Sequence, residues 1–201
     1  YATHATRSLC AIMLLDSAYI QERDAEYENK RNKRRKGEKV EPLYTTKDVK
    51  PTMDLFVTSG YNRWTRINER VEVLFRDAGH ILGSASVTLR IQENGRERIL
   101  AFTGDIGRPD RPILRDPQPM PEAEIVITES TYGNRLHEGR PNEMDHFLQI
   151  IKETCVEKRG KLIIPAFSVG RTQEIVYMLD QLHTHGKLPP IPVYVDSPLA
   201  V

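Results

Sequence analysis

The sequence predicts an α/β protein, and three observations lead to this prediction. Apolar residues recur at helical spacing from about Thr6 to Lys30. Two later stretches with strand-like alternation meet at Asn94-Gly95, a strong hairpin-turn signal. From Glu124 onward, strand-like runs alternate with helix-like runs, which is typical of a parallel sheet. We therefore expect helices and a hairpin first, followed by strand–helix units.

Two helices are predicted in the first sixty residues. The first, over residues 6–30, has apolar residues at helical spacing: Leu9, Ile12, Met13 and Ile20. The run 30–36 that follows holds six basic residues in seven, and it is either a phosphate-binding patch or a solvated helix end. Thr45 and Asp48 have the spacing of a capping box and predict a short helix toward Phe56.

The remaining elements follow in chain order. Strands are expected at 71–76, 85–92 and 99–102, with the turn at Asn94-Gly95 between the last two. Five prolines in residues 107–122 predict an ordered loop. After it we expect a strand at 124–128, a helix at 141–158, a buried strand at 162–165, a helix at 171–182 and a strand at 193–195.

Composition excludes several classes of protein. The 201 residues carry a formal net charge of +1, so any contact with nucleic acid requires a local basic patch. The two cysteines, Cys10 and Cys155, are too few and too distant for a disulfide framework, which favours a cytoplasmic location. No apolar run is long enough to span a membrane. Because the chain begins at Tyr1 and ends at Val201 soon after a strand signal, we expect it to be cut from a longer parent protein.

His80 and Asp105 are the first candidate functional residues. Each lies in a glycine-bearing loop at the end of an apolar strand-like run. A neutral imidazole and a carboxylate presented in this way are suitable zinc ligands. The alternatives are a polar residue in a surface turn for His80 and a turn-forming aspartate for Asp105. Two ligands are also fewer than the three or four protein ligands of a zinc site.

Glu129 repeats this design. A buried apolar strand is expected to deliver its carboxylate into a loop rich in Ser, Thr and Gly. A carboxylate there can orient a metal-bound water or a histidine ligand. The alternative is a solvated glutamate at a strand end.

Four segments resemble one protein family, and they occur in the family's order: residues 78–85 (AGHILGSA), 102–105 (FTGD), 129–133 (ESTYG) and 165–174 (PAFSVGRTQE). They are similar to the β-CASP branch of the metallo-β-lactamase-fold nucleases. The resemblance implies part of a metallo-β-lactamase αββα sandwich over residues 1–138, followed by the first part of a β-CASP α/β domain over 139–201.

The resemblance also implies roles for single residues. His80 matches a ligand of one zinc ion, and Asp105 matches the carboxylate that bridges two. Glu129 matches an acidic residue that supports catalysis through a histidine of the second half. Ser168 and Arg171 match the loop that opens the β-CASP half, where Arg171 is expected to contact a substrate phosphate beside a helix N-terminus. The alternative for this loop is an ordinary strand–helix connection.

The implied activity is zinc-dependent hydrolysis of single-stranded RNA by the parent protein. The family's H-x-H-x-D-H cluster should lie upstream of Tyr1, and its later histidines beyond Val201. His183 and His185 are expected at a helix end rather than as substitutes. The segment alone is therefore expected to bind zinc weakly or not at all and to be inactive. Its uncovered sheet edges are expected either to pair with a second copy in a homodimer or to make the segment fold poorly.

Two rival functions remain on the same fold. One is a non-catalytic RNA-binding scaffold subunit, which would not need His80, Asp105 and Glu129 together. The other is a different hydrolase, such as a thioester hydrolase, which is not expected to carry the segment Phe167–Arg171 with its following helix. Whether an RNA substrate is cut internally or by an exonuclease from one end stays open.

Overall fold

The computed structural model describes residues 1–35, 37–136 and 142–200. Two compact units divide the chain: residues 1–109 with 114–129, and residues 110–113 with 130–201. The domain boundary expected at 138/139 lies outside the described residues, so the domain assignment stays a prediction.

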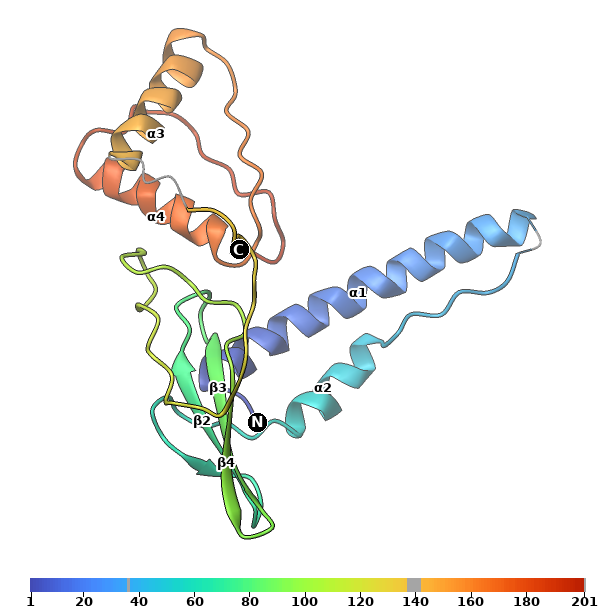
Figure 1. Ribbon diagram of the computed structural model, residues 1–201. Helices are drawn as coiled ribbons and strands as arrows, with labels where there is room; N and C mark the ends of the chain where they lie inside the picture. Colours follow the sequence, from blue (N-terminus) through green and yellow to red (C-terminus); the bar gives the residue numbers. More distant parts are fainter. Residues whose placement is uncertain (36, 137–141, 201) are drawn as a thin grey trace. The chain divides into compact units, whose positions relative to one another are not determined.

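A five-stranded sheet forms the centre of the first unit (Figure 1). Its strands are β1 (Thr65–Arg66), β2 (Val71–Asp77), β3 (Ala85–Glu93), β4 (Arg96–Phe102) and β5 (Ile125–Ile127), and their order in the sheet is the chain order. The first four strands pair antiparallel, while β5 pairs parallel to β4. The predicted hairpin is confirmed, because Asn94 and Gly95 both have positive φ and Glu93 lies opposite Arg96.

Two helices accompany this sheet, and both were predicted. α1 (His4–Arg35) is longer than expected, since the basic residues after position 30 continue the helix. α2 (Thr46–Asp54) begins at the predicted capping box, where the Asp48 carboxylate accepts hydrogen bonds from the Thr45 N–H and hydroxyl, each at 2.8 Å. These hydrogen bonds lower the pKa of Asp48, the backbone one most.

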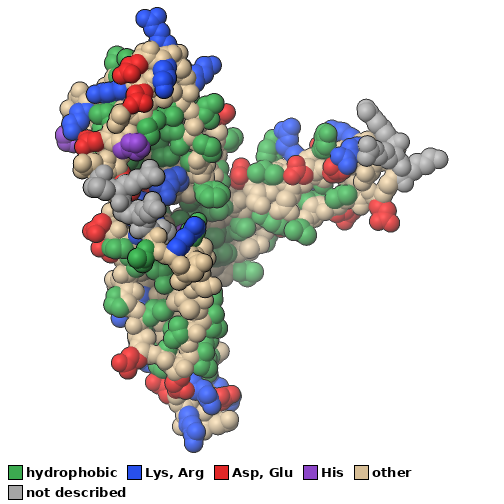
Figure 2. Space-filling model, turned by 45° about the horizontal axis from the view of Figure 1, so that its top comes forward, with side chains coloured by type: hydrophobic (Ala, Val, Ile, Leu, Met, Phe, Trp, Pro, Cys, Tyr) green, Lys and Arg blue, Asp and Glu red, His purple; other side chains and the backbone are tan. Residues whose placement is uncertain are grey.

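Burial is uneven within the first unit. Three consecutive residues of β2, Val73 to Phe75, are buried, so both faces of this strand are covered. Ala18 of α1 packs on Val49 and Met53 of α2, whereas the other face of α1 leaves apolar side chains exposed (Figure 2). β5 was expected to be buried, and this was wrong: its residues are about half exposed. No second layer covers this strand in the described part of the chain.

The second unit contains α3 (Glu143–Ile151), the π-helix η1 (Lys152–Glu157) and α4 (Arg171–Thr184). The predicted helices at 141–158 and 171–182 are confirmed, although residue 141 lies outside the described residues. The predicted strands at 162–165 and 193–195 are wrong, because neither segment pairs with a strand in the described residues. Ile163 is 82% exposed, not buried. An apolar run becomes a strand only where a sheet edge is available to accept its hydrogen bonds.

Among the described residues, no helix is both long and apolar enough to span a membrane.

Candidate metal and catalytic site

The sheet topology brings the three candidate residues to one end of the sheet. Both β2 and β4 pair antiparallel with β3, and β5 runs parallel to β4, so β2, β4 and β5 all end on the same side. One row crosses four strands near this end: Phe75, Val87, Phe102 and Ile127. His80, Asp105 and Glu129 follow this row by five, three and two residues. They are therefore neighbours in space.

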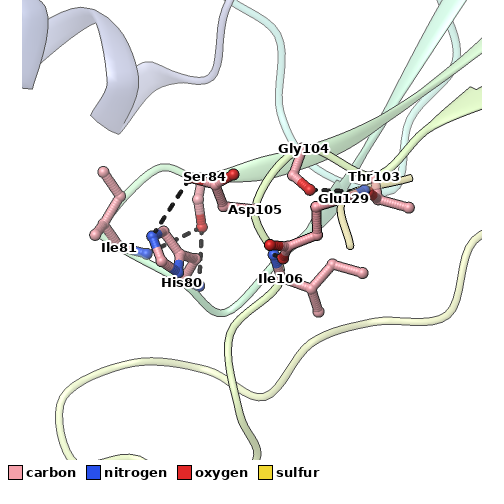
Figure 3. Close-up of polar contacts among 8 residues, drawn as sticks. All are labelled: His80, Ile81, Ser84, Thr103, Gly104, Asp105, Ile106 and Glu129. Carbon is pink, nitrogen blue, oxygen red and sulfur yellow. Dashed lines mark hydrogen bonds and ion pairs between the residues drawn. The ribbon is translucent and has the colours of Figure 1, made fainter. Parts of the chain in front are cut away.

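The His80 loop joins β2 to β3. Gly79 and Gly83 have φ of 62° and 88°, a conformation that favours glycine. The Ser84 hydroxyl accepts hydrogen bonds from the N–H groups of His80 (3.1 Å) and Ile81 (3.2 Å) (Figure 3). The loop is thus closed on itself, and the His80 side chain stays 45% exposed.

Residues far along the chain support this loop. The Gly83 carbonyl accepts hydrogen bonds from the hydroxyls of Thr3 (2.8 Å) and Thr6 (2.7 Å) at the start of α1. The Tyr61 hydroxyl donates to the Ser84 carbonyl at 2.9 Å. Burial raises the pKa of Tyr61, and the nearby Asp77 raises it further, so this phenol keeps its proton. Sequence reasoning missed these supports, since no local signal links them to position 80.

The Asp105 loop, which follows β4, packs directly on the His80 loop. The Gly107 N–H donates to the Ala78 carbonyl at 2.8 Å. A Cβ at Gly107 would overlap the carbonyl group of Gly79, so only glycine permits this approach. As a result, His80 Nε2 lies 3.7 Å from Asp105 Oδ2 (Figure 3).

Glu129 is fixed against the same loop at both its backbone and its side chain. Its N–H donates to the Thr103 hydroxyl at 3.2 Å, and its carboxylate accepts a hydrogen bond from the Ile106 N–H at 2.7 Å. Thr103 is buried at 3% exposure. The Glu129 carboxylate is therefore hydrogen-bonded to the residue that directly follows Asp105, and it is not free in solvent.

The spacing of His80 and Asp105 fits two ligands of one metal ion. Their 3.7 Å separation is longer than a hydrogen bond. Two donors on one tetrahedral zinc lie about 3.4 Å apart, given zinc–ligand distances of about 2.1 Å. The described residues contain no group of three or more His, Cys, Asp or Glu that could hold a metal. The described residues thus place two donors here, fewer than the three or four protein ligands of a zinc site.

Ser168 and Arg171 belong to the second unit, whereas His80, Asp105 and Glu129 belong to the first. Their loop is locally well defined: Gly170 has φ of 89°, and the Gln173 side chain bonds both the Gly170 N–H (2.8 Å) and the Ser168 carbonyl (2.9 Å). The Arg171 guanidinium pairs with Glu174 at 2.8 Å but remains half exposed.

The two late histidines lie at a helix end, as expected. His183 is in the last turn of α4, and His185 caps it with Nδ1 2.6 Å from the Gln181 carbonyl oxygen. In the described ranges they belong to no group of three or more His, Cys, Asp or Glu that could hold a metal.

Comparison with known proteins gives many relatives. The chain is 34% identical over 201 residues to Ribonuclease TTHA0252 of Thermus thermophilus, covering all of this chain and 40% of that protein. It is 35% identical over 159 residues to an RNase J-like protein of Methanocaldococcus jannaschii, covering 78% of this chain and 37% of that protein. It is 31% identical over 202 residues to Cleavage and polyadenylation specificity factor 73 of Drosophila melanogaster, covering all of this chain and 26% of that protein. No family model matches the chain.

The similarities to Ribonuclease TTHA0252 and to Cleavage and polyadenylation specificity factor 73 span the whole chain, so they include the loops of His80, Asp105 and Glu129. The chain spans 40% or less of the length of these curated relatives. On this basis the chain belongs to the β-CASP branch of the metallo-β-lactamase-fold nucleases.

Proposed function

We propose that a full-length protein carrying this chain is a zinc-dependent ribonuclease that hydrolyses phosphodiester bonds of single-stranded RNA. The observation that carries the proposal is the 3.7 Å approach of His80 to Asp105 at the end of the sheet. The printed names of the relatives, a ribonuclease and an RNase J-like protein among them, support an RNA substrate.

His80 and Asp105 would hold the metal in this proposal. When bound, zinc supplies Lewis acidity at the scissile phosphate and generates a nucleophile at neutral pH. Asp105 contributes a negative charge that two metal ions can share, and the imidazole of His80 contributes one neutral donor. The hydrogen bonds of Ser84 to the His80 loop keep this donor in place without using the ring.

Glu129 is proposed to orient a proton-transfer partner, a histidine from the rest of the protein. The Ile106 N–H donates a hydrogen bond to the Glu129 carboxylate, so this carboxylate is attached to the loop that carries Asp105. Ser168 and Arg171 are proposed to bind substrate phosphates, for which Arg171 must exchange Glu174 for an RNA phosphate. We also propose a cytoplasmic location. Two chains are proposed to pair at the edge of β5, which is the last strand of the sheet in the described part of the chain.

The test is cleavage of a labelled single-stranded RNA by the full-length protein, before and after metal removal. A chelator is expected to abolish cleavage and added zinc to restore it, while the 201-residue chain alone is expected not to cleave. Full activity in the presence of chelator would contradict the metal dependence. A folded full-length protein that binds RNA without cleaving it would instead support the scaffold alternative.

A further inference from the structure

α1 has one covered face and one free face. On the covered face, Ala18 and Ala25 are buried at 0% and 7% exposure. Residues 37–45, which we call the return segment, run along this same face, because the Gln21 side chain accepts a hydrogen bond from the Leu43 N–H at 3.2 Å. Figure 1 shows the second half of α1 continuing past α2 with this segment beside it.

Two asparagines fasten the return segment near the end of α1. Asn29 bonds the N–H and the carbonyl of Val40, each at 2.8 Å, and Asn32 donates to the Glu38 carbonyl at 2.9 Å. Because Ala25, Asn29 and Asn32 share one helix face, the opposite face is left free. The second half of α1 is thus stabilised on one face by the return segment.

The free face alternates tyrosine and arginine at every fourth position: Tyr19, Arg23, Tyr27 and Arg31. Residues four apart lie above one another on a helix, so these four form one row about 18 Å long. Tyr19 and Tyr27 are 52% and 66% exposed. Lys30, on the same side, is also exposed. We call these five residues the Tyr/Arg face.

The contacts within this face are weak enough to exchange for a ligand. The Arg23 guanidinium lies 5.6 Å from the centre of the Tyr19 ring and donates to its hydroxyl at 2.8 Å. Arg31 pairs with Glu28 at 3.3 Å, with both side chains well exposed. Exposed pairs of this kind are weak, because solvent screens the charges and the side chains lose freedom when they pair. The tyrosine rings and the guanidinium groups are therefore accessible.

Charge at the far end of the face favours an anion. Residues 29–37 contain no acidic residue, and six of the seven residues 30–36 are basic. The acidic residues at 22, 24, 26 and 28 precede this end and lie beside the Tyr/Arg row rather than within it. The field is therefore positive where Lys30 and Arg31 lie.

We propose that the Tyr/Arg face binds single-stranded RNA, with bases stacked on Tyr19 and Tyr27 and phosphates on Arg23, Lys30 and Arg31. Aromatic rings interleaved with basic side chains are what sequence-tolerant binding of single strands requires. An acidic peptide would use the charges but not the exposed rings. The choice of RNA rests on the proposed function, and the face is distinct from the site at His80 and Asp105.

The experiment measures the affinity of the 201-residue chain for a fluorescein-labelled single-stranded RNA of mixed sequence, by anisotropy at several salt concentrations. Arg23→Ala with Arg31→Ala is expected to weaken binding and to lower the salt slope by about 1.4, since two phosphate contacts are lost. Tyr27→Ala is expected to weaken binding about five- to hundred-fold, whereas Tyr27→Phe keeps the affinity.

The matched control is Lys47→Ala with Lys50→Ala, which removes two exposed positive charges from the neighbouring α2. Circular dichroism verifies that every variant keeps its helix content. The proposal is overturned if the control loses as much affinity as the arginine variant, or if the Tyr/Arg variants bind RNA like the original chain. The latter result would leave an acidic protein partner as the better account of the face.

The two proposals fail separately. If the full-length protein cleaves RNA while the Tyr/Arg variants keep their affinity, the face is not an RNA site and the ribonuclease proposal stands. If the variants lose affinity and the full-length protein never cleaves RNA, the face stands and the ribonuclease proposal falls.

Discussion

Asp105→Asn is expected to lower RNA cleavage by the full-length protein by roughly three orders of magnitude. The amide keeps the size of the side chain but removes the negative charge that the metal needs. Loss of metal-based stabilisation is worth several kcal/mol of barrier, and each 1.36 kcal/mol is about tenfold in rate. Because Asp105 is 73% exposed, stability should change by no more than about 0.5 kcal/mol.

The control for this prediction is Asp54→Asn, an exposed carboxylate at the end of α2. It removes the same charge far from the site in the chain and is expected to leave the cleavage rate unchanged. Single-turnover cleavage under excess protein separates chemistry from binding. An Asp105→Asn protein that cleaves RNA at the original rate would show that Asp105 has no catalytic part.

Gly107→Ala is expected to destabilise the chain by about 1–3 kcal/mol, the usual cost of forcing an extra methyl group into a packed contact. The added Cβ overlaps the backbone of Gly79 and approaches the N–H of His80, and neither can rotate away. Gly107 is not among the glycines with positive φ, so the steric overlap alone opposes alanine. Urea unfolding measures the change in midpoint.

Gly60→Ala is the matched control for this substitution. No heavy atom lies within 4 Å of a Cβ built there, and Gly60 also lacks a positive φ. It should therefore unfold at nearly the same urea concentration as the original chain. Equal midpoints for the Gly107 and Gly60 variants would contradict the close packing of the two loops.

The elements that local sequence determines were predicted well. Asn94 and Gly95 specify a two-residue turn by their own backbone preferences, so the β3–β4 hairpin follows from them alone. The Thr45 and Asp48 pair likewise marks the start of α2. In contrast, the runs at 162–165 and 193–195 are apolar but pair with no strand among the described residues, because strand formation depends on a partner that the run itself does not encode.

The site was only partly predictable for the same reason. The loops of His80, Asp105 and Glu129 could be placed at strand ends from their glycines and apolar runs. The 3.7 Å approach of His80 to Asp105 and the 2.7 Å hydrogen bond from the Ile106 N–H to Glu129 could not be predicted in this way. They depend on which strands are neighbours and on the close approach of the two loops at Gly107. The expected burial of β5 failed because burial depends on a covering layer, not on the composition of the strand.

The most direct test of the central claim is the metal content of the full-length protein, measured beside its Asp105→Ala and His80→Ala variants. We predict about two zinc ions per protein, falling sharply in Asp105→Ala and less in His80→Ala, since the carboxylate is proposed to serve both ions. A folded protein that contains no metal, or variants that keep the full zinc content, would contradict a metal centre built on His80 and Asp105.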